Sequence, residues 1–223
     1  MTLNYFISIV QCTMSLVKSN VVVSVDCGVC NMGFAVIGFL QNDDGTFDFE
    51  VIEVSKVSIG TMRDPIAVVA RNLIEYMNSN ENLKRADISH VFIEQQLGHA
   101  VKNSILSFTA FSYFETLRAT QGIELKTKFV PPKQKFEAVR AAFTEPSILE
   151  GIDFDRHGRE LKKLSVEIMV QLCNKFDIPE GTRALKANKK KDDVADAFIQ
   201  AFALFSVSSI KRSSGNPIRT RRR

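Results

Sequence analysis

Isolated acidic residues end two apolar segments of this sequence, and this arrangement constrains the fold more than any other feature. Asp26 follows the β-branched run 21–25, and Glu94 follows a second apolar run. Such runs predict buried strands, so each carboxylate is expected at a strand end, where α/β sheets commonly bind ligands. A third acidic site, with Asp193 and Asp196 three residues apart, begins a strongly apolar helix.

Each acidic site has an ordinary explanation when it is taken alone. An acid at a strand end is often simply solvated, and acids in the first turn of a helix favour its macrodipole. Burying an unpaired carboxylate nevertheless costs on the order of several kcal/mol, so such a group normally has a cation or lies at a solvated edge. Three acidic sites in an order that one fold accommodates favour a shared site for hard cations, which take oxygen ligands. This arrangement is typical of two-metal phosphodiesterases.

The remaining pattern predicts a mixed sheet flanked by helices. Three consecutive strands joined by turn residues give the sheet an antiparallel side, and helices then alternate with two further strands. Consecutive prolines end the last strand, because proline cannot continue a central ladder. The expected strands are 21–26, 34–40, 47–54, 88–94 and 127–130, and the expected helices are 66–77, 103–120, 134–143, 159–176 and 192–205. This order fits an α/β fold of the ribonuclease H-like class, with a mixed five-stranded sheet.

The basic residues are unevenly distributed. The last 13 residues hold six of the 29 Lys and Arg residues and no acid, so residues 1–210 carry 23 basic and 25 acidic side chains. We expect an N-terminal extension over 1–19, a nuclease domain over 20–208 and a basic, disordered tail over 209–223. Residues 1–13 could instead form an edge strand. The tail would contact nucleic-acid phosphates, or would serve solubility or nuclear import.

The cysteines and the N-terminus indicate a reducing compartment. Four scattered cysteines are too few for a disulfide framework, and the first residues lack the basic segment of a secretory signal. No apolar run approaches the roughly 18 residues of a membrane helix. We therefore expect a cytoplasmic protein that is not secreted and has no membrane partner.

Two short motifs suggest other chemistry but lack the residues it needs. Cys27-Gly-Val-Cys30 has no second ligand pair for zinc, so these are expected to be buried or turn cysteines. Gly28 and Gly33 lack the Lys-Ser/Thr of a phosphate-binding loop. The aromatic cluster within 108–114 is mostly core by its spacing, but it covers more than one helix face and could form a dimer seam.

With these motifs in place, the sequence resembles the RuvC-type Holliday junction resolvases. Val25-Asp-Cys-Gly28 followed by Gly33-Phe-Ala35 is similar to the family's opening turn and second strand. Phe92-Ile-Glu-Gln95 and Asp193-Val-Ala-Asp-Ala197 are similar to its second acidic motif and its terminal helix. The likeness spans about residues 20–206. The abundant Phe, the Lys-Lys-Asp-Asp approach to the last helix and the basic tail resemble the poxvirus members, and avian poxviruses in particular.

The resemblance implies the roles of individual residues. Four carboxylates would be catalytic and would bind two Mg²⁺ ions, or Mn²⁺ ions: Asp26, Glu94, Asp193 and Asp196. A catalytic lysine is implied after the fourth main strand, where Lys133 matches best and Lys135 is the second choice; neighbouring lysines could simply be solvated. The sequence departs from the family at Cys27, where relatives have proline, and at Leu97, where bacterial relatives have an aromatic wedge.

The resemblance also implies a function. The chain would be a structure-selective endonuclease that resolves four-way DNA junctions by paired symmetric cuts. It would act as a homodimer in viral genome processing and recombination, at replication sites in the infected cell. Two alternatives stay open: a non-catalytic module that binds branched DNA, and an ATP-binding relative of actin and the sugar kinases. The second would require two such domains and glycine-rich phosphate hairpins.

Overall fold

The computed structural model describes most of the chain between Ser19 and Ile210. The described ranges are 19–41, 47–96, 100–143, 149–157 and 160–210. Nearly all of the expected N-terminal extension and basic tail, together with Leu97, lies outside these residues, so the predictions made for them stay predictions.

Five strands, six α-helices and one short 3-10 helix make up the described fold. The strands are β1 (Ser19–Asp26), β2 (Met32–Gln41), β3 (Phe47–Val57), β4 (Ile88–Glu94) and β5 (Lys126–Val130). The helices are α1 (Ile66–Ser79), η1 (Glu81–Leu83), α2 (Val101–Gln121), α3 (Gln134–Ala142), α4 (Glu160–Lys175), α5 (Pro179–Ala187) and α6 (Asp192–Ile210).

The sheet has the strand order β3-β2-β1-β4-β5. The pairs β1·β2 and β2·β3 are antiparallel, whereas β1·β4 and β4·β5 are parallel. The predicted mixed five-stranded sheet is therefore confirmed. Strand β1 lies at its centre, and the carboxyl ends of β1 and β4 lie side by side because these two strands are parallel neighbours.

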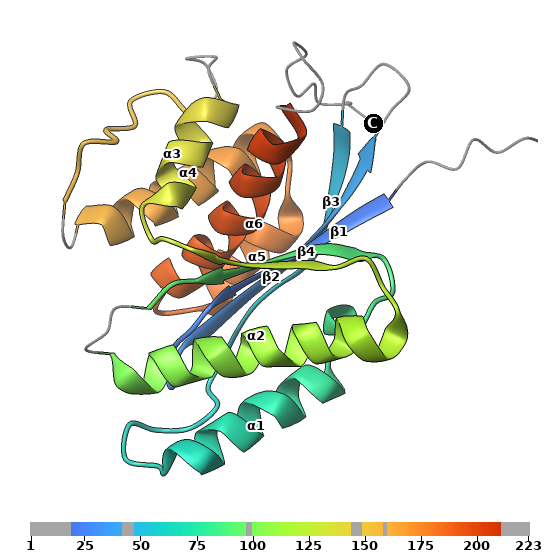
Figure 1. Ribbon diagram of the computed structural model, residues 1–223. Coiled ribbons are helices and arrows are strands. Elements are labelled where there is room, and N and C mark those ends of the chain that lie inside the picture. Colours follow the sequence, from blue (N-terminus) through green and yellow to red (C-terminus); the bar gives the residue numbers. More distant parts are fainter. Residues whose placement is uncertain (1–18, 42–46, 97–99, 144–148, 158–159, 211–223) are drawn as a thin grey trace, which may run out of the picture.

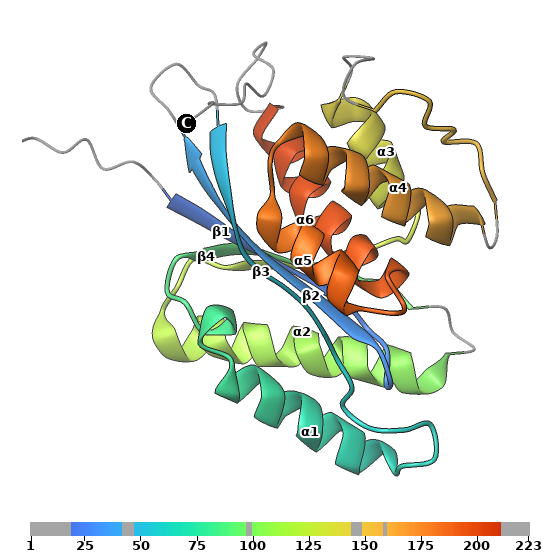
Figure 2. The same ribbon diagram turned by 180° about the vertical axis from the view of Figure 1, so that it is seen from behind.

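Helices cover both faces of the sheet. Helices α1 and α2 lie on one face, and α3, α4, α5 and α6 lie on the other (Figures 1 and 2). No helix in the described part of the chain is both long enough and apolar enough to cross a membrane.

Alternate residues of β1 face opposite helical layers, because successive side chains of a strand point to opposite faces. Val21, Val23 and Val25 belong to the core that contains residues of α1 and α2, whereas Val22 belongs to the core shared with α3 to α6. The same alternation directs Asp26 toward the α6 side.

The element boundaries agree with expectation to within a few residues, apart from two elements that the sequence pattern did not predict. Helix α5 was missed, although Pro179 at its first position followed by Glu180 is a recognisable helix start. The short η1 was also missed. Helix α6 continues to Ile210, five residues beyond its expected end.

Candidate metal centre

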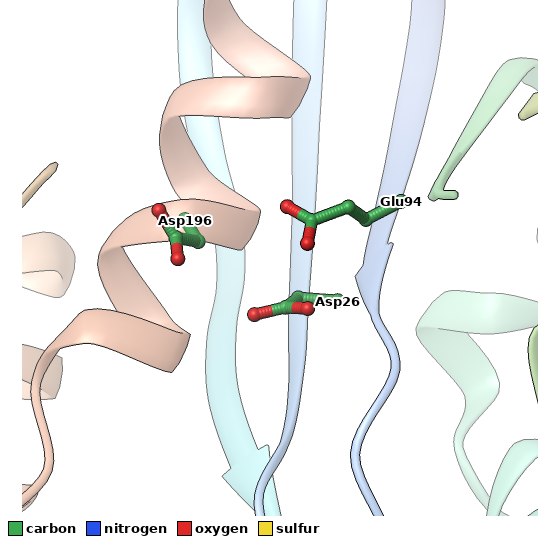
Figure 3. A group of neighbouring side chains, drawn as sticks. All are labelled: Asp26, Glu94 and Asp196. Carbon is green, nitrogen blue, oxygen red and sulfur yellow. The ribbon is translucent and has the colours of Figure 1, made fainter. Parts of the chain in front are cut away.

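Three carboxylates from separate elements meet at the end of the central parallel strand pair. Asp26 is the last residue of β1, Glu94 is the last residue of β4, and Asp196 lies in the second turn of α6. One oxygen of each carboxylate lies within 4.8 Å of the others. Figure 3 shows the three side chains pointing toward one another beside the helix that carries Asp196. The structure thus brings together three of the four carboxylates that the sequence predicted to converge.

A close approach of helix and strand allows Asp196 to reach this position. Gly33 on β2 faces the main-chain carbonyl of Asp193, and a Cβ at Gly33 would collide with that oxygen. The missing side chain lets the first turn of α6 lie directly on the sheet. The turn after Asp26 is also tight, since a Cβ on Gly28 would meet the carbonyl of Asn31 at 2.5 Å.

Lys135 of α3 supplies a cation inside the cluster. Its Nζ lies 2.7 Å from Glu94 Oε2 and 2.8 Å from Asp196 Oδ1, and only 4% of its side chain is exposed. Burial alone would lower the pKa of Lys135, but the negative charges of Asp196, Glu94 and Asp26 outweigh it and hold the pKa above its usual value. The ammonium therefore stays charged.

Burial and mutual repulsion raise the pKa values of Asp26 and Glu94, whereas an ordinary ion pair lowers the pKa of a carboxyl group. The pKa of Asp26 is raised well above its usual value, first by burial and then by the charges of Glu94 and Asp196. Burial also raises the pKa of Glu94, and Lys135 only partly offsets this effect. The site thus favours additional positive charge, because a proton or a cation would relieve the repulsion.

Ser165 of α4 is a site residue that the sequence prediction missed. Its Oγ donates a 2.5 Å hydrogen bond to Asp196 Oδ1, and the residue is fully buried. The bond orients the carboxylate from the side of α4. A serine within a helix carries no signal of such a role in the sequence alone.

Asp193 lies beside the cluster and not within it. Lys190 Nζ lies 2.7 Å from Asp193 Oδ1, while Oδ2 is buried and has no hydrogen-bond partner among the described residues. Burial raises the pKa of this carboxyl, although Lys190 opposes the shift. Asp192 pairs with Lys162 of α4 at 2.8 Å and is not a member of the three-carboxylate group.

The structure brings Lys135 to the carboxylates and leaves Lys133, the preferred choice from the sequence, on the surface. Lys133 occupies the N-cap position of α3, where its side chain makes no capping hydrogen bond, and it is exposed. Lys135 shares the buried face of α3 with Phe136, Ala138 and Val139. A lysine within the apolar stripe of a short helix needs a buried partner, and this signal was available in the sequence.

Cys27 and Cys30 come just after Asp26 in the chain, and they do not form a metal-binding pair. Both are free; Cys27 is buried and Cys30 is exposed, as expected for turn cysteines. Burial, followed by the charge of Asp26, raises the pKa of Cys27 well above its usual value, so its thiol stays protonated.

The donor set suits a hard divalent cation. When Asp26, Glu94 and Asp196 are ionised, Lys135 balances only one of three negative charges. Carboxylate oxygens are the ligands that Mg²⁺ and Mn²⁺ favour, and Asp193, three residues before Asp196 on α6, has a buried Oδ2 with no hydrogen-bond partner among the described residues. The residues therefore fit a metal site.

Solved structures share this architecture. The yeast mitochondrial Holliday junction resolvase Ydc2 is 14% identical, with 86% of this chain and 80% of that chain covered and a TM-score of 0.54. Thermus thermophilus RuvC bound to a Holliday junction substrate is 11% identical over 87% and 96% of the two chains, with a TM-score of 0.47. The human cytomegalovirus terminase nuclease domain is 14% identical over 84% and 83%, with a TM-score of 0.41. No protein-family model and no curated protein sequence matches this chain.

At these identities the similarity establishes the fold and nothing finer. The likeness to Ydc2 carries that conclusion, and the predicted ribonuclease H-like class is confirmed. The neighbours are resolvases and a nuclease domain by their own descriptions.

Proposed function

We propose that this protein is a divalent-metal-dependent endonuclease that resolves four-way DNA junctions by paired, symmetric phosphodiester cleavage. One observation carries the proposal: Asp26, Glu94 and Asp196 converge from three elements, and Lys135 compensates only part of their charge. The sequence resemblance to RuvC-type resolvases and the shared fold support the same conclusion.

Asp26, Glu94 and Asp196 would hold the metal, with Asp193 completing the set through its unpaired oxygen. Two bound Mg²⁺ or Mn²⁺ ions would supply Lewis acidity and an activated water for in-line attack on the phosphate. The protein contributes a rigid, largely buried set of oxygens at the end of the sheet. Ser165 holds Asp196 in one orientation, which limits the reorganisation needed when the site is loaded.

Lys135 would place a fixed positive charge beside the reacting phosphate. The ammonium is held by two carboxylates, so its position is set before substrate arrives. A charge held in place stabilises developing negative charge without reorganisation at the moment of reaction. We therefore assign the catalytic lysine to Lys135 in place of Lys133.

DNA would be held mainly through its phosphates. Lys189 and Lys191 are exposed immediately before α6, on the approach to Asp193 and Asp196. The basic residues after 210 would extend this contact. Phosphate contacts position a protein without reading bases, so we expect substrate choice to depend on the shape of the junction.

The working unit would be a twofold symmetric homodimer, because a four-way junction presents two equivalent strands to be cut. Among the described residues, α2 exposes a stripe of large apolar side chains: Val101, Ile105 and Phe108, which are 61%, 39% and 61% exposed. A second copy of this chain would cover that stripe. Phe114 is fully buried, so the expectation that it could lie at a subunit seam is wrong.

The biological setting is part of the proposal. The sequence resemblance to poxvirus resolvases supports a role in the processing and recombination of viral genomes, at replication sites in the cytoplasm of the host cell. If the chain is viral, resolution of branched intermediates in infected cells tests this part of the proposal separately from the chemistry.

A labelled mobile four-way junction, incubated with the purified protein with and without Mg²⁺, tests the function. We expect paired cuts that require the metal and leave 5′-phosphate and 3′-hydroxyl ends. Junction binding with no cutting in Mg²⁺ or Mn²⁺ would favour a non-catalytic DNA-binding module. ATP binding without junction binding would favour the actin-like alternative.

A further inference from the structure

A buried polar contact lies directly beneath the three carboxylates. Gln200 of α6 is 1% exposed, and its Nε2 donates hydrogen bonds to Ser24 Oγ at 2.9 Å and to the main-chain oxygen of Phe92 at 3.0 Å. Its two amide hydrogens thus connect α6 to β1 and to β4. Ser24 is itself fully buried.

Each of these three residues lies on the same element as one of the carboxylates, two residues away on a strand or one turn away on the helix. Gln200 follows Asp196 by four residues, so the two side chains share one face of α6. Ser24 precedes Asp26 by two residues, and each therefore points to the same face of β1. Phe92 likewise precedes Glu94 by two residues on β4, although Gln200 contacts the main-chain oxygen of Phe92 and not its side chain. Ser24 and Phe92 are also direct partners in the parallel pairing of the two strands.

Stability alone does not account for a glutamine at this place. Gln200 lies among fully buried apolar residues of α6, including Ile199, Ala201 and Phe202. Apolar side chains of similar volume at both Gln200 and Ser24 would fill the space without burying an amide and a hydroxyl, and such paired exchanges can be nearly neutral or stabilising. Hydrogen bonds add direction: two donors on one amide fix both the height and the rotation of α6 relative to the two strands.

We propose that Gln200 is a positioning residue for the candidate metal centre, setting α6 against β1 and β4 so that Asp196 meets Asp26 and Glu94. It acts through the backbone and touches neither substrate nor metal. The predicted effect on metal binding rests on the proposed function, whereas the predicted effect on carboxylate geometry does not.

The first measurement is metal affinity in the full-length chain, by calorimetric titration with Mn²⁺ alone. Gln200→Met keeps the volume and removes both hydrogen bonds, and we expect affinity about tenfold lower, the lower end for removal of a supporting hydrogen bond at a metal site. Ser24→Ala removes one of the two bonds and leaves the helix unchanged, so a smaller reduction is expected. Leu73→Met is the matched control, because it also keeps the volume of a fully buried side chain, lies in the core on the opposite face of the sheet and should leave affinity unchanged.

The second measurement is the metal-free crystal structure of Gln200→Met. We expect Asp196 to shift so that Lys135 no longer contacts both Glu94 and Asp196. If Gln200→Met retains both lysine contacts and wild-type affinity, the proposal is overturned; if that variant does not fold, wild-type affinity in Ser24→Ala overturns it. If the wild type binds no Mn²⁺ while Asp196 is displaced in the variant, the metal site fails and the positioning role stands.

Discussion

Lys135 Nζ lies 2.7 Å from Glu94 Oε2, and the two side chains keep only 4% and 14% of their surface exposed. A buried ammonium therefore holds together a group of carboxylates that would otherwise repel one another. The same ion pair makes Lys135 important for folding as well as for the proposed chemistry, and the two roles are separable by experiment.

Replacing Lys135 with methionine should destabilise the metal-free protein strongly. Breaking a buried ion pair typically costs about 3–5 kcal/mol, because the remaining charge is left uncompensated. Lys133→Met is the matched control on the exposed start of α3, and its effect should stay within about 0.5 kcal/mol. Urea denaturation in EDTA near neutral pH measures both values.

The pH dependence of this penalty has a definite sign. The pKa of Lys135 lies above its usual value of 10.5, so its stabilising contribution is fully present below that value and is lost only above it. Protonation of Asp26 and Glu94, whose pKa values are raised, removes the uncompensated charge. The penalty of Lys135→Met should therefore shrink as the pH falls below neutral. Equal destabilisation by Lys133→Met and Lys135→Met would contradict the assignment.

Neutralising a candidate metal ligand should abolish cleavage while leaving junction binding intact. The variants are Asp26→Asn, Glu94→Gln, Asp193→Asn and Asp196→Asn. Each removes a ligand charge but keeps the shape, so we expect cleavage at least about 100-fold slower, the upper end for removal of a merely supporting group. Single-turnover cleavage and gel-shift binding of the same labelled junction separate the two effects.

One control variant and one stability measurement accompany these variants. Asp192→Asn affects a carboxylate that pairs with exposed Lys162 and should cleave almost normally. Asp26→Asn should also raise the melting temperature in EDTA, because the ionised form of this buried carboxyl is disfavoured in the folded state. A greater loss in Asp192→Asn than in Asp193→Asn would shift the ligand assignment by one residue.

Gly33→Ala should separate α6 from the sheet. The added Cβ would meet the main-chain oxygen of Asp193, and we expect a cost of about 1–3 kcal/mol, as for overpacking elsewhere. Gly38→Ala on the same strand is the control, since its Cβ would lie 3.5 Å from Ile52 Cδ1 in ordinary contact. Thermal denaturation should distinguish the two, and only Gly33→Ala should lose metal affinity. Equal melting temperatures would show that the close approach is unimportant.

Phe108→Asp should convert the proposed dimer into monomers that nick a junction without resolving it. Phe108 is 61% exposed on α2, so a charge there is tolerated by the isolated chain but not by an apolar interface. Phe114→Asp should instead unfold the protein, because Phe114 is fully buried. Sedimentation velocity at micromolar concentration gives the oligomeric state. A wild-type monomer that still makes paired cuts would rule out the dimer.

Deleting residues 211–223 should weaken junction binding and flatten its salt dependence without stopping cleavage. The segment carries six basic residues, and the slope of log K against log salt should fall by about 0.9 for each phosphate that the shortened chain no longer neutralises. Binding titrations between low and moderate salt give that slope. An unchanged slope would assign the segment to solubility or targeting.

The ends of β1 and β4 could be predicted from the sequence because a charged residue directly after an apolar run marks where a buried strand reaches solvent. An apolar run followed by one acid marks the end of β1 at Asp26 and of β4 at Glu94, and both boundaries match the structure. Asp196 followed from its place near the start of an apolar helix. These predictions depended only on local pattern.

The rest of the site depended on the relative placement of helices, which local pattern does not contain. Lys135 left a signal as a lysine within the apolar stripe of α3, but which carboxylates it contacts depends on how α3 packs against the sheet and α6. Ser165 reaches Asp196 only because α4 packs against α6, which brings together residues 31 positions apart. Gln200 did leave a signal, as a polar residue one helical turn beyond Asp196 in an otherwise apolar stretch. Its partners could not be identified before the sheet was known.

The two separate cores on the faces of the sheet have a practical consequence. Every residue assigned to the chemistry belongs to the strand ends or to the layer of α3 to α6, whereas α1 and α2 pack on the other face (Figure 1). The outer surface of α1, away from the exposed apolar stripe of α2, can therefore be altered without changing the carboxylate cluster. Fluorescent labels, affinity handles or fused domains attached to α1 would lie on the face of the sheet opposite the candidate metal centre.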